Sequence, residues 1–356
     1  MRITHVLFNL RTGGAETMLV DIMNRQVADG DDVTLLLINR GHQQHLRDAI
    51  DPRVKVVELG RKIGAKNPLW LLRVNLALHR LHPDVVHVHN KMALGMLYGP
   101  RRYAVVFTYH CCGDVNPYSR RPDMLCAISQ AVSADVAARG EGSCEIVYNG
   151  IDTSAIAMRR PASPQTPPRL VQIGSLYADI KGQHITLRAL AAMRHADATV
   201  DFYGDGHSRA DLEALTHELG LDKRVRFMGT RSRRELYDAL PGYDVALLPS
   251  LNEGFGLALA EPMAAGVPVV ASNLPGPSEV LRDADSILGT TVPAGNPQAL
   301  ADAIDGILDA FTEALALAVD AATSVRRRFD IAGTVARYRE LYSRLTGATD
   351  QHTLQP

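Results

Sequence analysis

Short apolar runs rich in valine, isoleucine and leucine alternate with longer stretches whose apolar residues recur at helical spacing along the first half of the chain. Strands are predicted at residues 3–8, 33–38, 54–59, 85–88, 105–109 and 145–147. Helices are predicted at residues 16–28, 68–81 and 130–139, with Ser129 as the N-cap residue of the last one. Because strands alternate with helices, this half is predicted to form right-handed βαβ units around a parallel sheet.

The same alternation begins again after a proline-rich segment. Residues 161–168 hold four prolines, which neither join a sheet ladder nor favour a helix, so this segment is predicted to be a linker. Beyond it, strands are predicted at residues 170–173, 199–203, 225–228, 245–248 and 267–271. Helices are predicted at residues 183–193, 208–219, 233–240 and 257–265, and the tail from Pro297 is predicted to be helical. The chain is therefore predicted to form two doubly wound α/β domains, with ligands bound beyond the carboxyl ends of the strands.

The bulk composition is that of an ordinary globular protein. A length of 356 residues exceeds what one hydrophobic core usually serves, which supports two domains. A formal net charge of −1 provides no global field that would attract nucleic acid. The four cysteines form no C-x-x-C pair and are interpreted as reduced thiols. The first residues do not resemble a signal peptide and no run of about 18 apolar residues occurs, so a cytoplasmic protein is expected.

The segment Leu247–Val270 carries the clearest candidate chemistry. A buried strand is predicted to end at Pro249, and a polar loop followed by Gly-Phe-Gly then leads into a helix. The main-chain amides of Phe255, Gly256 and Leu257 would lie at the N-terminus of that helix, which suits a bound diphosphate.

Two carboxylates flank this helix start. Glu253 precedes the helix and Glu261 lies about one turn inside it, so they can point at different parts of one extended ligand. A diphosphate would repel both, so they are predicted to accept hydrogen bonds from sugar hydroxyls. From these residues alone, a solvated Glu253 and a Glu261 that only offsets the helix dipole remain open.

The pattern S-x-x-E-G-F-G-L-x-x-x-E-x-M-A-x-G-x-P-V-V in residues 250–270 resembles the E-x7-E signature of retaining glycosyltransferases of family 4, which have the GT-B architecture. The resemblance extends over nearly the whole chain. It implies that Glu253 contacts the donor sugar and that Glu261 binds the ribose hydroxyls of the nucleotide. It also implies that the amides after Glu253 face the sugar and the phosphates.

Two further segments resemble phosphate-binding elements of the family. The segment N-L-R-T-G-G-A-E looks like its N-terminal glycine loop, which implies that Gly13 and Gly14 lie against the donor; a plain tight turn is the alternative. The segment G-S-L-Y-A-D-I-K-G resembles a G-R-L-x-x-x-K-G element, which implies that Lys181 pairs with the departing diphosphate. Ser175 stands where the family has an arginine, so another cation or the helix amides would have to supply that charge.

Histidines end two predicted strands of the first half. His87 and His89 alternate with valines in D-V-V-H-V-H-N, so they share one strand face and are predicted to be hydrogen-bonded rather than metal ligands. His110 ends the next strand, and the resemblance implies that it reaches the donor sugar and the reaction centre; a loop histidine is the alternative. No second histidine within the local segment would activate Cys111 or Cys112, which disfavours a cysteine nucleophile.

Three weaker patterns complete the resemblance. The loops Y-G-D-G and V-R-F-M-G-T-R look like those near the nucleobase, which makes Met228 and Arg231 candidates for donor binding. The V-Y-N-G-I-D segment is predicted to be a tight turn that closes the first domain. Residues 326–345 resemble terminal helices that return to brace the first domain, with Tyr338 and Tyr342 on one helical face.

Together these features predict two Rossmann-like domains that face a central cleft, the GT-B fold class. Residues 1–160 are predicted to bind the acceptor, completed by a C-terminal helix at about residues 335–356. Residues 169–334 are predicted to bind the nucleotide-sugar donor, after the linker at 161–168. Basic residues near the predicted helix at 68–81 leave contact with an anionic membrane open beside simple packing of that helix.

The expected activity is retaining, metal-independent transfer of a hexosyl group to an acceptor hydroxyl, with His110, Lys181 and Glu253 as catalytic residues and no cofactor beyond the donor substrate. A UDP-sugar is the donor that the breadth of the family favours. The acceptor could be a glycan, a lipid-linked glycan or a small aglycone. Two alternatives remain: a GT-B sugar-nucleotide epimerase or hydrolase, and a catalytically silent nucleotide-sugar-binding subunit, to which the missing arginine gives weight.

Overall fold

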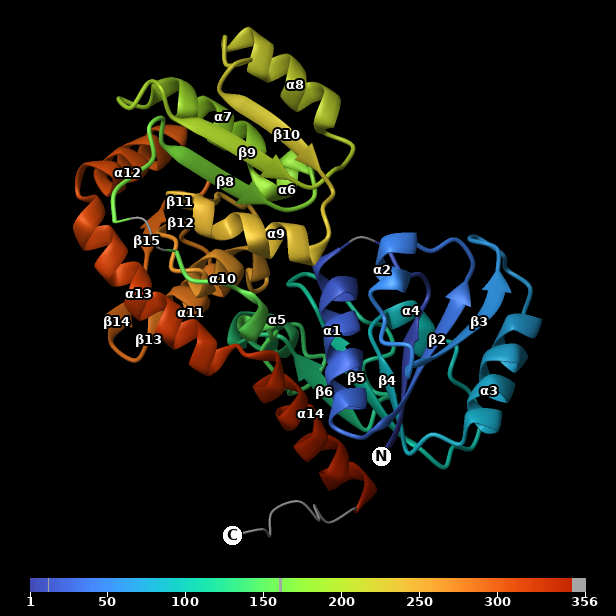
Figure 1. The fold of residues 1–356 in the computed structure, drawn as a ribbon. Helices are drawn as coiled ribbons and strands as arrows, with labels where there is room; N and C mark the ends of the chain where they lie inside the picture. The colour runs from blue at the N-terminus through green and yellow to red at the C-terminus, as the bar shows by residue number, and fades with distance from the viewer. Residues whose placement is uncertain (12, 160–161, 348–356) are drawn as a thin grey trace. The chain divides into compact units, whose positions relative to one another are not determined.

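The computed structural model describes residues 1–11, 13–159 and 162–347, which form two compact units (Figure 1). The first unit is built from Met1–Gly150 together with the chain from Ile331 onward, and the second from Ile151–Asp330. The chain passes between the units after Gly150 and again after Asp330, and Ile151 forms a β-bridge with Asp330. The first unit is therefore discontinuous in sequence, whereas the second is a single stretch of chain.

The first unit contains a parallel seven-stranded sheet in the order β3-β2-β1-β4-β5-β6-β7. Its strands are β1 (Arg2–Leu7), β2 (Asp32–Asn39), β3 (Lys55–Arg61), β4 (Val85–Val88), β5 (Ala104–Tyr109), β6 (Met124–Ala127) and β7 (Glu145–Ile146). Its helices are α1 (Gly14–Ala28), α2 (Gln44–Asp48), α3 (Leu69–Leu81), α4 (Lys91–Leu94), α5 (Gln130–Ala138) and α14 (Ile331–Thr346). The strand order reverses between β1 and β4, which defines one topological switch point.

The second unit repeats this plan with a parallel six-stranded sheet in the order β10-β9-β8-β11-β12-β15. Its strands are β8 (Arg169–Ile173), β9 (Thr199–Tyr203), β10 (Val225–Gly229), β11 (Val245–Leu248), β12 (Val269–Ser272) and β15 (Thr290–Val292), and a small hairpin joins β13 (Arg282–Asp283) to β14 (Ser286–Ile287). Its helices are α6 (Ala178–Lys181), α7 (Gln183–Ala192), α8 (Arg209–Glu218), α9 (Arg233–Ala239), α10 (Leu257–Ala264), α11 (Pro275–Leu281), α12 (Pro297–Asp309) and α13 (Phe311–Arg328). Here the order reverses between β8 and β11.

The predicted alternation of strands and helices is confirmed in both halves. Ser129 caps α5 as predicted, because its hydroxyl accepts a hydrogen bond from the Val132 amide at 3.1 Å. Several short elements were not predicted, since their few residues show no helical or strand period: α2, α4, β6, α6, α11, β13, β14 and β15.

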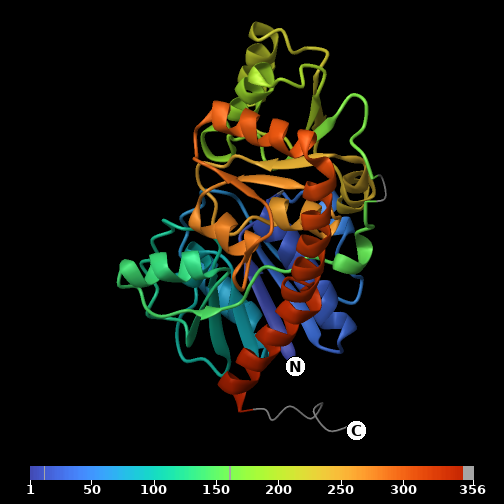
Figure 2. The same cartoon turned by 90° about the vertical axis from the view of Figure 1, so that its left-hand side faces the viewer.

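The terminal helix α14 packs against α1 and against the first sheet (Figure 2). Tyr338 and Tyr342 are both fully buried on the face that it turns to the sheet, as their spacing predicted. The helix begins at Ile331, before the predicted start at about residue 335, and residues 348–356 of that prediction lie outside the described part of the chain.

The predicted linker at 161–168 does not separate the units. Pro161 lies outside the described residues, but the segment around it belongs to the second unit, and the boundary falls after Gly150. Arg159 and Asp244 form a fully buried ion pair at 2.6 Å, and the same carboxylate accepts hydrogen bonds from the amides of Gln165 and Arg169. This carboxylate therefore fixes the proline-rich segment to the second unit on both sides.

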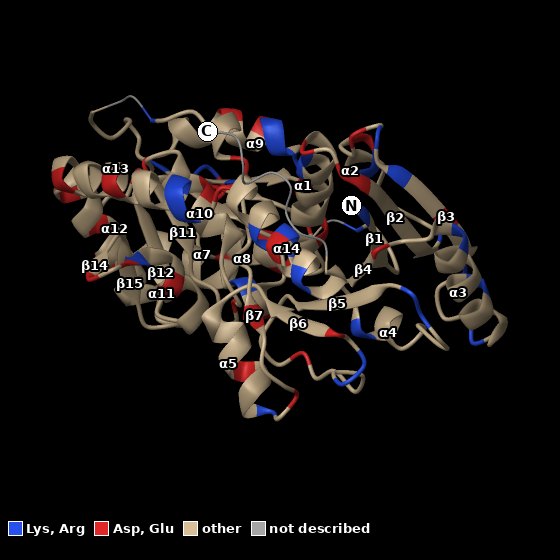
Figure 3. Cartoon of the chain, turned by 90° about the horizontal axis from the view of Figure 1, so that it is seen from below, with Lys and Arg blue, Asp and Glu red and all other residues tan. Residues whose placement is uncertain are grey.

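Charged residues of both signs are interspersed over the elements of each unit (Figure 3). None of the helices in the described part of the chain is long and apolar enough to cross a membrane.

The buried ion pair of Asp244 leads to a prediction about the free energy of unfolding. In Asp244→Ala, Arg159 would remain buried without a counter-charge, so we expect a loss of about 3–5 kcal/mol from the stability of the second unit. The measurement is the midpoint of urea unfolding. The control is Asp238→Ala, because Asp238 is 72% exposed and pairs with Arg234 only at 3.9 Å. Equal midpoints for the two variants would contradict the structural role of Asp244.

Candidate active site

The switch point of the second sheet brings two predicted site segments together. The loop after β8 and the loop after β11 leave the carboxyl ends of neighbouring strands. They touch at Gly182, where an added Cβ would lie 2.1 Å from the carbonyl oxygen of Pro249. Gly182 also has a φ of +69°, which side chains rarely adopt. This close approach therefore explains why a glycine follows Lys181 in the sequence.

Lys181 and Glu253 meet across these two loops. The Lys181 ammonium donates a hydrogen bond to Glu253 Oε2 at 2.7 Å, and both side chains are largely covered, with 26% and 14% of their surface exposed. Ser250 donates a longer hydrogen bond of 3.5 Å to the same oxygen. Two residues that the sequence placed at one site, from segments 72 positions apart, thus lie in direct contact.

The helix start beside Glu253 has the predicted geometry. Gly256 is the N-cap residue of α10 and has a φ of +113°, which only glycine adopts readily. The amides of Phe255, Gly256 and Leu257 lie at this N-terminus, where the helix dipole favours an anion. The Phe255 side chain is buried and packs edge-to-face on Phe329, with ring centroids 5.1 Å apart. Phe255 therefore anchors the loop through its ring and can contribute to binding through its main chain.

Glu261 is buried on α10 and meets two residues of α9. Arg233 donates a hydrogen bond to Glu261 Oε1 at 3.2 Å, and the Tyr237 hydroxyl lies 3.4 Å from the same oxygen. Burial raises the pKa of the Glu261 carboxyl, and the Arg233 guanidinium and the Tyr237 hydroxyl oppose that rise. Glu261 is therefore held in a polar pocket rather than solvated at the helix surface.

Arg233 and Tyr237 were not predicted as site residues. The capping box formed by Ser232 and Glu235 begins α9 immediately before Arg233. Tyr237 follows four residues later and so shares the face of Arg233. The S-x-x-E pattern was a visible signal for the helix start, but only the packing of α9 on α10 shows that its first turn faces Glu261.

The remaining donor candidates lie near the same edge of the sheet. Ser175 follows β8, and its carbonyl accepts a hydrogen bond from the Gln183 side chain at 2.9 Å. The Y-G-D-G loop packs on this segment, because a Cβ added at Gly204 would lie 2.1 Å from the Gly174 carbonyl oxygen. Met228 is partly buried at the end of β10, and Arg231 is exposed beyond it. These two are farther from the pair of Lys181 and Glu253, since β9 lies between β10 and β8.

The switch point of the first sheet holds a cavity of about 290 Å³. Four segments line it: the end of β1 with the loop after it, the start of α1, the loop after β3 and the chain just after β4. The lining residues are Leu7, Phe8, Asn9, Arg11, Ala15, Glu16, Ile63, His89 and Asn90. Gly13 and Gly14 are at the N-terminus of α1 beside it, and Thr12 lies outside the described residues. Gly13 has extended backbone, and an added Cβ would lie 2.6 Å from Glu16 Oε2. This glycine therefore leaves room for the Glu16 carboxylate, whose pKa burial raises.

Four histidines gather behind this cavity. His87 and His89 share one face of β4, as predicted, with ring centroids 4.1 Å apart, and His5 of β1 lies opposite His87 in the strand register. His110 follows β5, and its Nε2 lies 3.1 Å from His89 Nδ1. The structure thus joins the three predicted histidines into one cluster and adds His5.

The cluster has the spacing of a metal site, because one nitrogen from each of His5, His87 and His89 lies within 4.8 Å of the others. All six nitrogens of these three rings already have hydrogen-bond partners: each other, Gln26, Thr108, Tyr342 and His110. The arrangement therefore fits the predicted hydrogen-bonded histidines.

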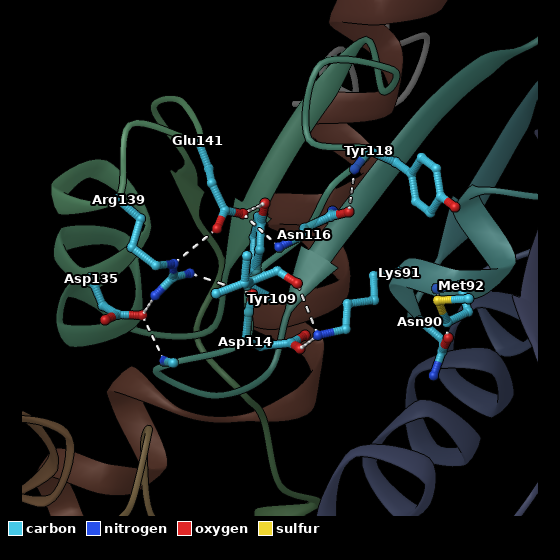
Figure 4. Close-up of polar contacts among 12 residues, drawn as sticks. Asn90, Lys91, Met92, Tyr109, Asp114, Asn116, Tyr118, Asp135, Arg139 and Glu141 are labelled. Atoms are coloured by element: carbon cyan, nitrogen blue, oxygen red, sulfur yellow. Dashed lines mark hydrogen bonds and ion pairs between the residues drawn. The ribbon is translucent and has the colours of Figure 1, made fainter.

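The loop after His110 is held by an ionic network (Figure 4). Glu141 accepts hydrogen bonds from the Tyr109 hydroxyl at 2.7 Å, from the Asn116 amide at 3.0 Å and from the Arg139 guanidinium at 2.8 Å. Lys91 donates to Asp114 at 2.5 Å from the far side of the loop. These contacts fix the direction in which the chain leaves β5 and therefore the position of His110.

Comparison with known proteins agrees with this geometry. The profile described as "Glycosyltransferase Family 4" matches residues 12–155, and that described as "Glycosyl transferases group 1" matches residues 154–318. Two Rossmann-like units, each with a parallel sheet and a topological switch point, are the architecture of a GT-B glycosyltransferase. The chain belongs to glycosyltransferase family 4.

Individual relatives match over most of the chain. Two lipopolysaccharide core biosynthesis glycosyltransferases of Rhizobium meliloti (strain 1021) are each 26% identical: LpsE over 86% of this chain and 89% of its own length, and LpsD over 97% and 98%. Among solved structures, Anabaena Alr3699/HepE in complex with UDP and glucose has a TM-score of 0.82 at 21% identity, covering 97% of this chain and all of that chain. The predicted fold class is therefore confirmed.

Proposed function

We propose that this protein is a retaining glycosyltransferase that moves a hexosyl group from a UDP-sugar to a hydroxyl of a glycan or lipid-linked glycan. The observation that carries this proposal is the contact between Lys181 and Glu253 beside the N-terminus of α10. One cation, one carboxylate and three main-chain amides at a switch point fit a sugar joined to a diphosphate. The UDP and glucose bound by Alr3699/HepE and the lipopolysaccharide role of LpsE and LpsD support the choice of donor and acceptor.

In the proposed donor site, the diphosphate lies at the amides of Phe255, Gly256 and Leu257, with Lys181 beside it. Glu253 accepts hydrogen bonds from the transferred sugar, and Glu261 accepts them from the ribose. Arg233 favours the charged form of Glu261 in its buried position, since a guanidinium at 3.2 Å offsets part of the cost of burying a carboxylate. Each acidic residue thus has a cation that holds it in place in the absence of donor.

In the proposed reaction, the bond between the anomeric carbon and the β-phosphate oxygen breaks, and its electron pair goes to the leaving UDP. The acceptor oxygen bonds the anomeric carbon from the same face, and its proton goes to the departing phosphate. Negative charge grows on the diphosphate during this step, so fixed positive charge lowers the barrier. Because Ser175 supplies none, the proposal assigns this role to Lys181 and the α10 amides.

For the acceptor we propose the cavity at the first switch point. Asn9, Arg11, Glu16 and Asn90 supply hydrogen-bonding groups of both kinds around it, and Ile63 supplies an apolar wall. Such a mixture suits the hydroxyls and the apolar ring face of a sugar. His110 lies behind this cavity through His89 and is proposed to contact the reacting sugar.

The role of Glu253 is tested by Glu253→Gln, which keeps the shape of the side chain and removes its charge. We expect kcat for sugar transfer to fall by about 100-fold or more, because the carboxylate would no longer accept strong hydrogen bonds from the sugar. Turnover is measured by release of the nucleoside diphosphate in the presence of acceptor. Glu218→Gln, an exposed residue at the end of α8, is the matched control and should leave kcat unchanged. Normal turnover by Glu253→Gln would refute this assignment.

The donor is tested by thermal shift with a panel of nucleotide sugars, with and without EDTA. A donor at about 100 times its dissociation constant stabilises the protein by about 2.7 kcal/mol. We expect UDP-sugars to raise the melting temperature more than GDP-sugars do, and to the same extent in EDTA, since amides and Lys181 hold the diphosphate. A larger shift with GDP-sugars would refute the UDP assignment, and a shift abolished by EDTA would refute metal independence.

The same samples separate the alternative activities. Conversion of the donor at full rate without an acceptor would identify an epimerase or hydrolase. Tight donor binding without transfer to lipopolysaccharide-type acceptors would identify a silent binding subunit. Transfer that requires an acceptor supports the proposed enzyme.

We further propose that α3 lies against an anionic membrane that carries the acceptor lipid. Leu69, Leu72 and Leu76 form an exposed stripe on one face of this helix, with 59%, 64% and 41% of their surface accessible. Lys62, Lys66 and other exposed cations, among them Arg73 and Arg80, surround the stripe. An apolar face bordered by cations is the pattern of a helix that lies in the interface of an anionic bilayer.

The membrane proposal predicts binding to lipid vesicles. The wild-type protein should sediment with vesicles that contain an anionic phospholipid, less at high salt, and much less with purely zwitterionic vesicles. The variant Leu72→Gln/Leu76→Gln should lose most of this binding, whereas Val319→Gln, which changes an exposed apolar residue of α13, should retain it. Equal sedimentation of both variants would refute a role for α3.

A further inference from the structure

A row of hydrogen bonds connects the interior of α1 to His110. Gln26 is buried on α1, and its Oε1 lies 2.8 Å from His5 Nε2. His5 Nδ1 lies 3.0 Å from His89 Nε2, and His89 Nδ1 lies 3.1 Å from His110 Nε2. The row therefore begins at the Gln26 oxygen, and each later hydrogen bond joins a nitrogen of one histidine ring to a nitrogen of the next. It ends at His110 Nδ1.

Burial favours the neutral form of all three rings in this row. Burial lowers the pKa of His5 and of His110 to about 4, and it lowers the pKa of His89 well below its usual value. A neutral imidazole carries one N–H and one acceptor nitrogen. In a row of such rings, the direction of the first hydrogen bond therefore determines the direction of all the others.

Gln26 determines that direction. The atom of Gln26 that contacts His5 is its side-chain oxygen, Oε1. An amide oxygen has lone pairs and no proton, so it can only accept a hydrogen bond. The carbonyl oxygen of Gln26 then faces His5 as an acceptor, and His5 must carry its proton on Nε2.

The protons of the following rings are then fixed in turn. His5 Nδ1 is an acceptor, so His89 carries its proton on Nε2 and accepts at Nδ1. His110 must donate to it from Nε2, which leaves His110 Nδ1 without a proton. This nitrogen is buried and has no hydrogen-bond partner among the described residues. A buried acceptor without a partner has a free-energy cost that a hydroxyl donor would remove.

We propose that Gln26 is a positioning residue that acts through His5 and His89 to hold His110 in the Nε2-protonated tautomer, so that His110 Nδ1 accepts a hydrogen bond from a substrate hydroxyl. The inference rests on the proposed function for the identity of the substrate, but the tautomer follows from the protein alone. The reverse order would turn His110 Nδ1 into a donor, which would face the hydroxyl with a proton instead of a lone pair.

A parallel branch of the same network supplies a control. The Tyr342 hydroxyl lies 2.6 Å from His87 Nδ1, and His87 Nε2 lies 2.7 Å from Thr108 Oγ1. Thr108 is as deeply buried as Gln26, but it lies outside the row that leads to His110. Thr108→Val therefore removes a buried hydrogen bond of the cluster without changing the direction of the hydrogen bonds in that row.

The test combines nitrogen-15 spectra of histidine-labelled protein with kinetics of the full chain. In the wild type we expect the signature of an unprotonated Nδ1 at His110. Gln26→Met removes the acceptor, so His110 should become a mixture of tautomers. Gln26→Glu keeps an oxygen acceptor and should retain the wild-type tautomer. Thr108→Val should also retain it.

In the kinetic measurements we expect Gln26→Met to change turnover but not nucleotide binding. Gln26→Met should lower kcat by about tenfold and leave the affinity for UDP unchanged, and Gln26→Glu should recover most of that loss. If His110 shows the wild-type tautomer in Gln26→Met, the proposal is wrong, whatever happens to turnover. If no acceptor is ever glycosylated, the proposed function fails, while the tautomer spectra still decide the role of Gln26.

Discussion

The reversal of strand order between β8 and β11 is the constraint on which the candidate active site depends. Connections on the two sides of the reversal run in opposite directions, so the loops that follow these two strands are left facing each other. The Lys181 loop and the Glu253 loop meet there, with a contact so close that only glycine fits at position 182. The first sheet has the same reversal between β1 and β4, and its cavity and histidines occupy the same place.

The two acidic residues of the site depend on this arrangement in different ways. Glu253 is on a loop, and its partner Lys181 comes from the other side of the reversal. Glu261 is inside a helix, and its partners Arg233 and Tyr237 come from the helix packed beside it. Loss of the loop contact would therefore disorganise Glu253 first, whereas Glu261 depends on the packing of α9 and α10.

Much of the fold could be predicted from the sequence, because β-branched runs and helical periods mark most elements directly. The boundaries of β4, β9 and β11 were predicted to the residue. By contrast, β6 contains no β-branched residue in its four positions, and the proline-rich segment resembles a linker although Asp244, far along the chain, fixes it. The candidate site residues on loops after strands were predicted because their segments resemble motifs of the family. Gln26, His5 and Arg233 were not, because only tertiary packing brings these elements to the site.

The discontinuity of the first unit has a consequence for how the protein is made. Residues 151–330 form a continuous unit, so this part can fold as soon as it has left the ribosome. The first seven strands emerge earlier but lack α14, which supplies Tyr338 and Tyr342 to the histidine cluster. Until α14 is synthesised, His87 has no phenol partner, and the face of the sheet that α14 covers is open to water. The packing around His87 is therefore completed only when a segment that follows the whole second unit in the sequence has been added.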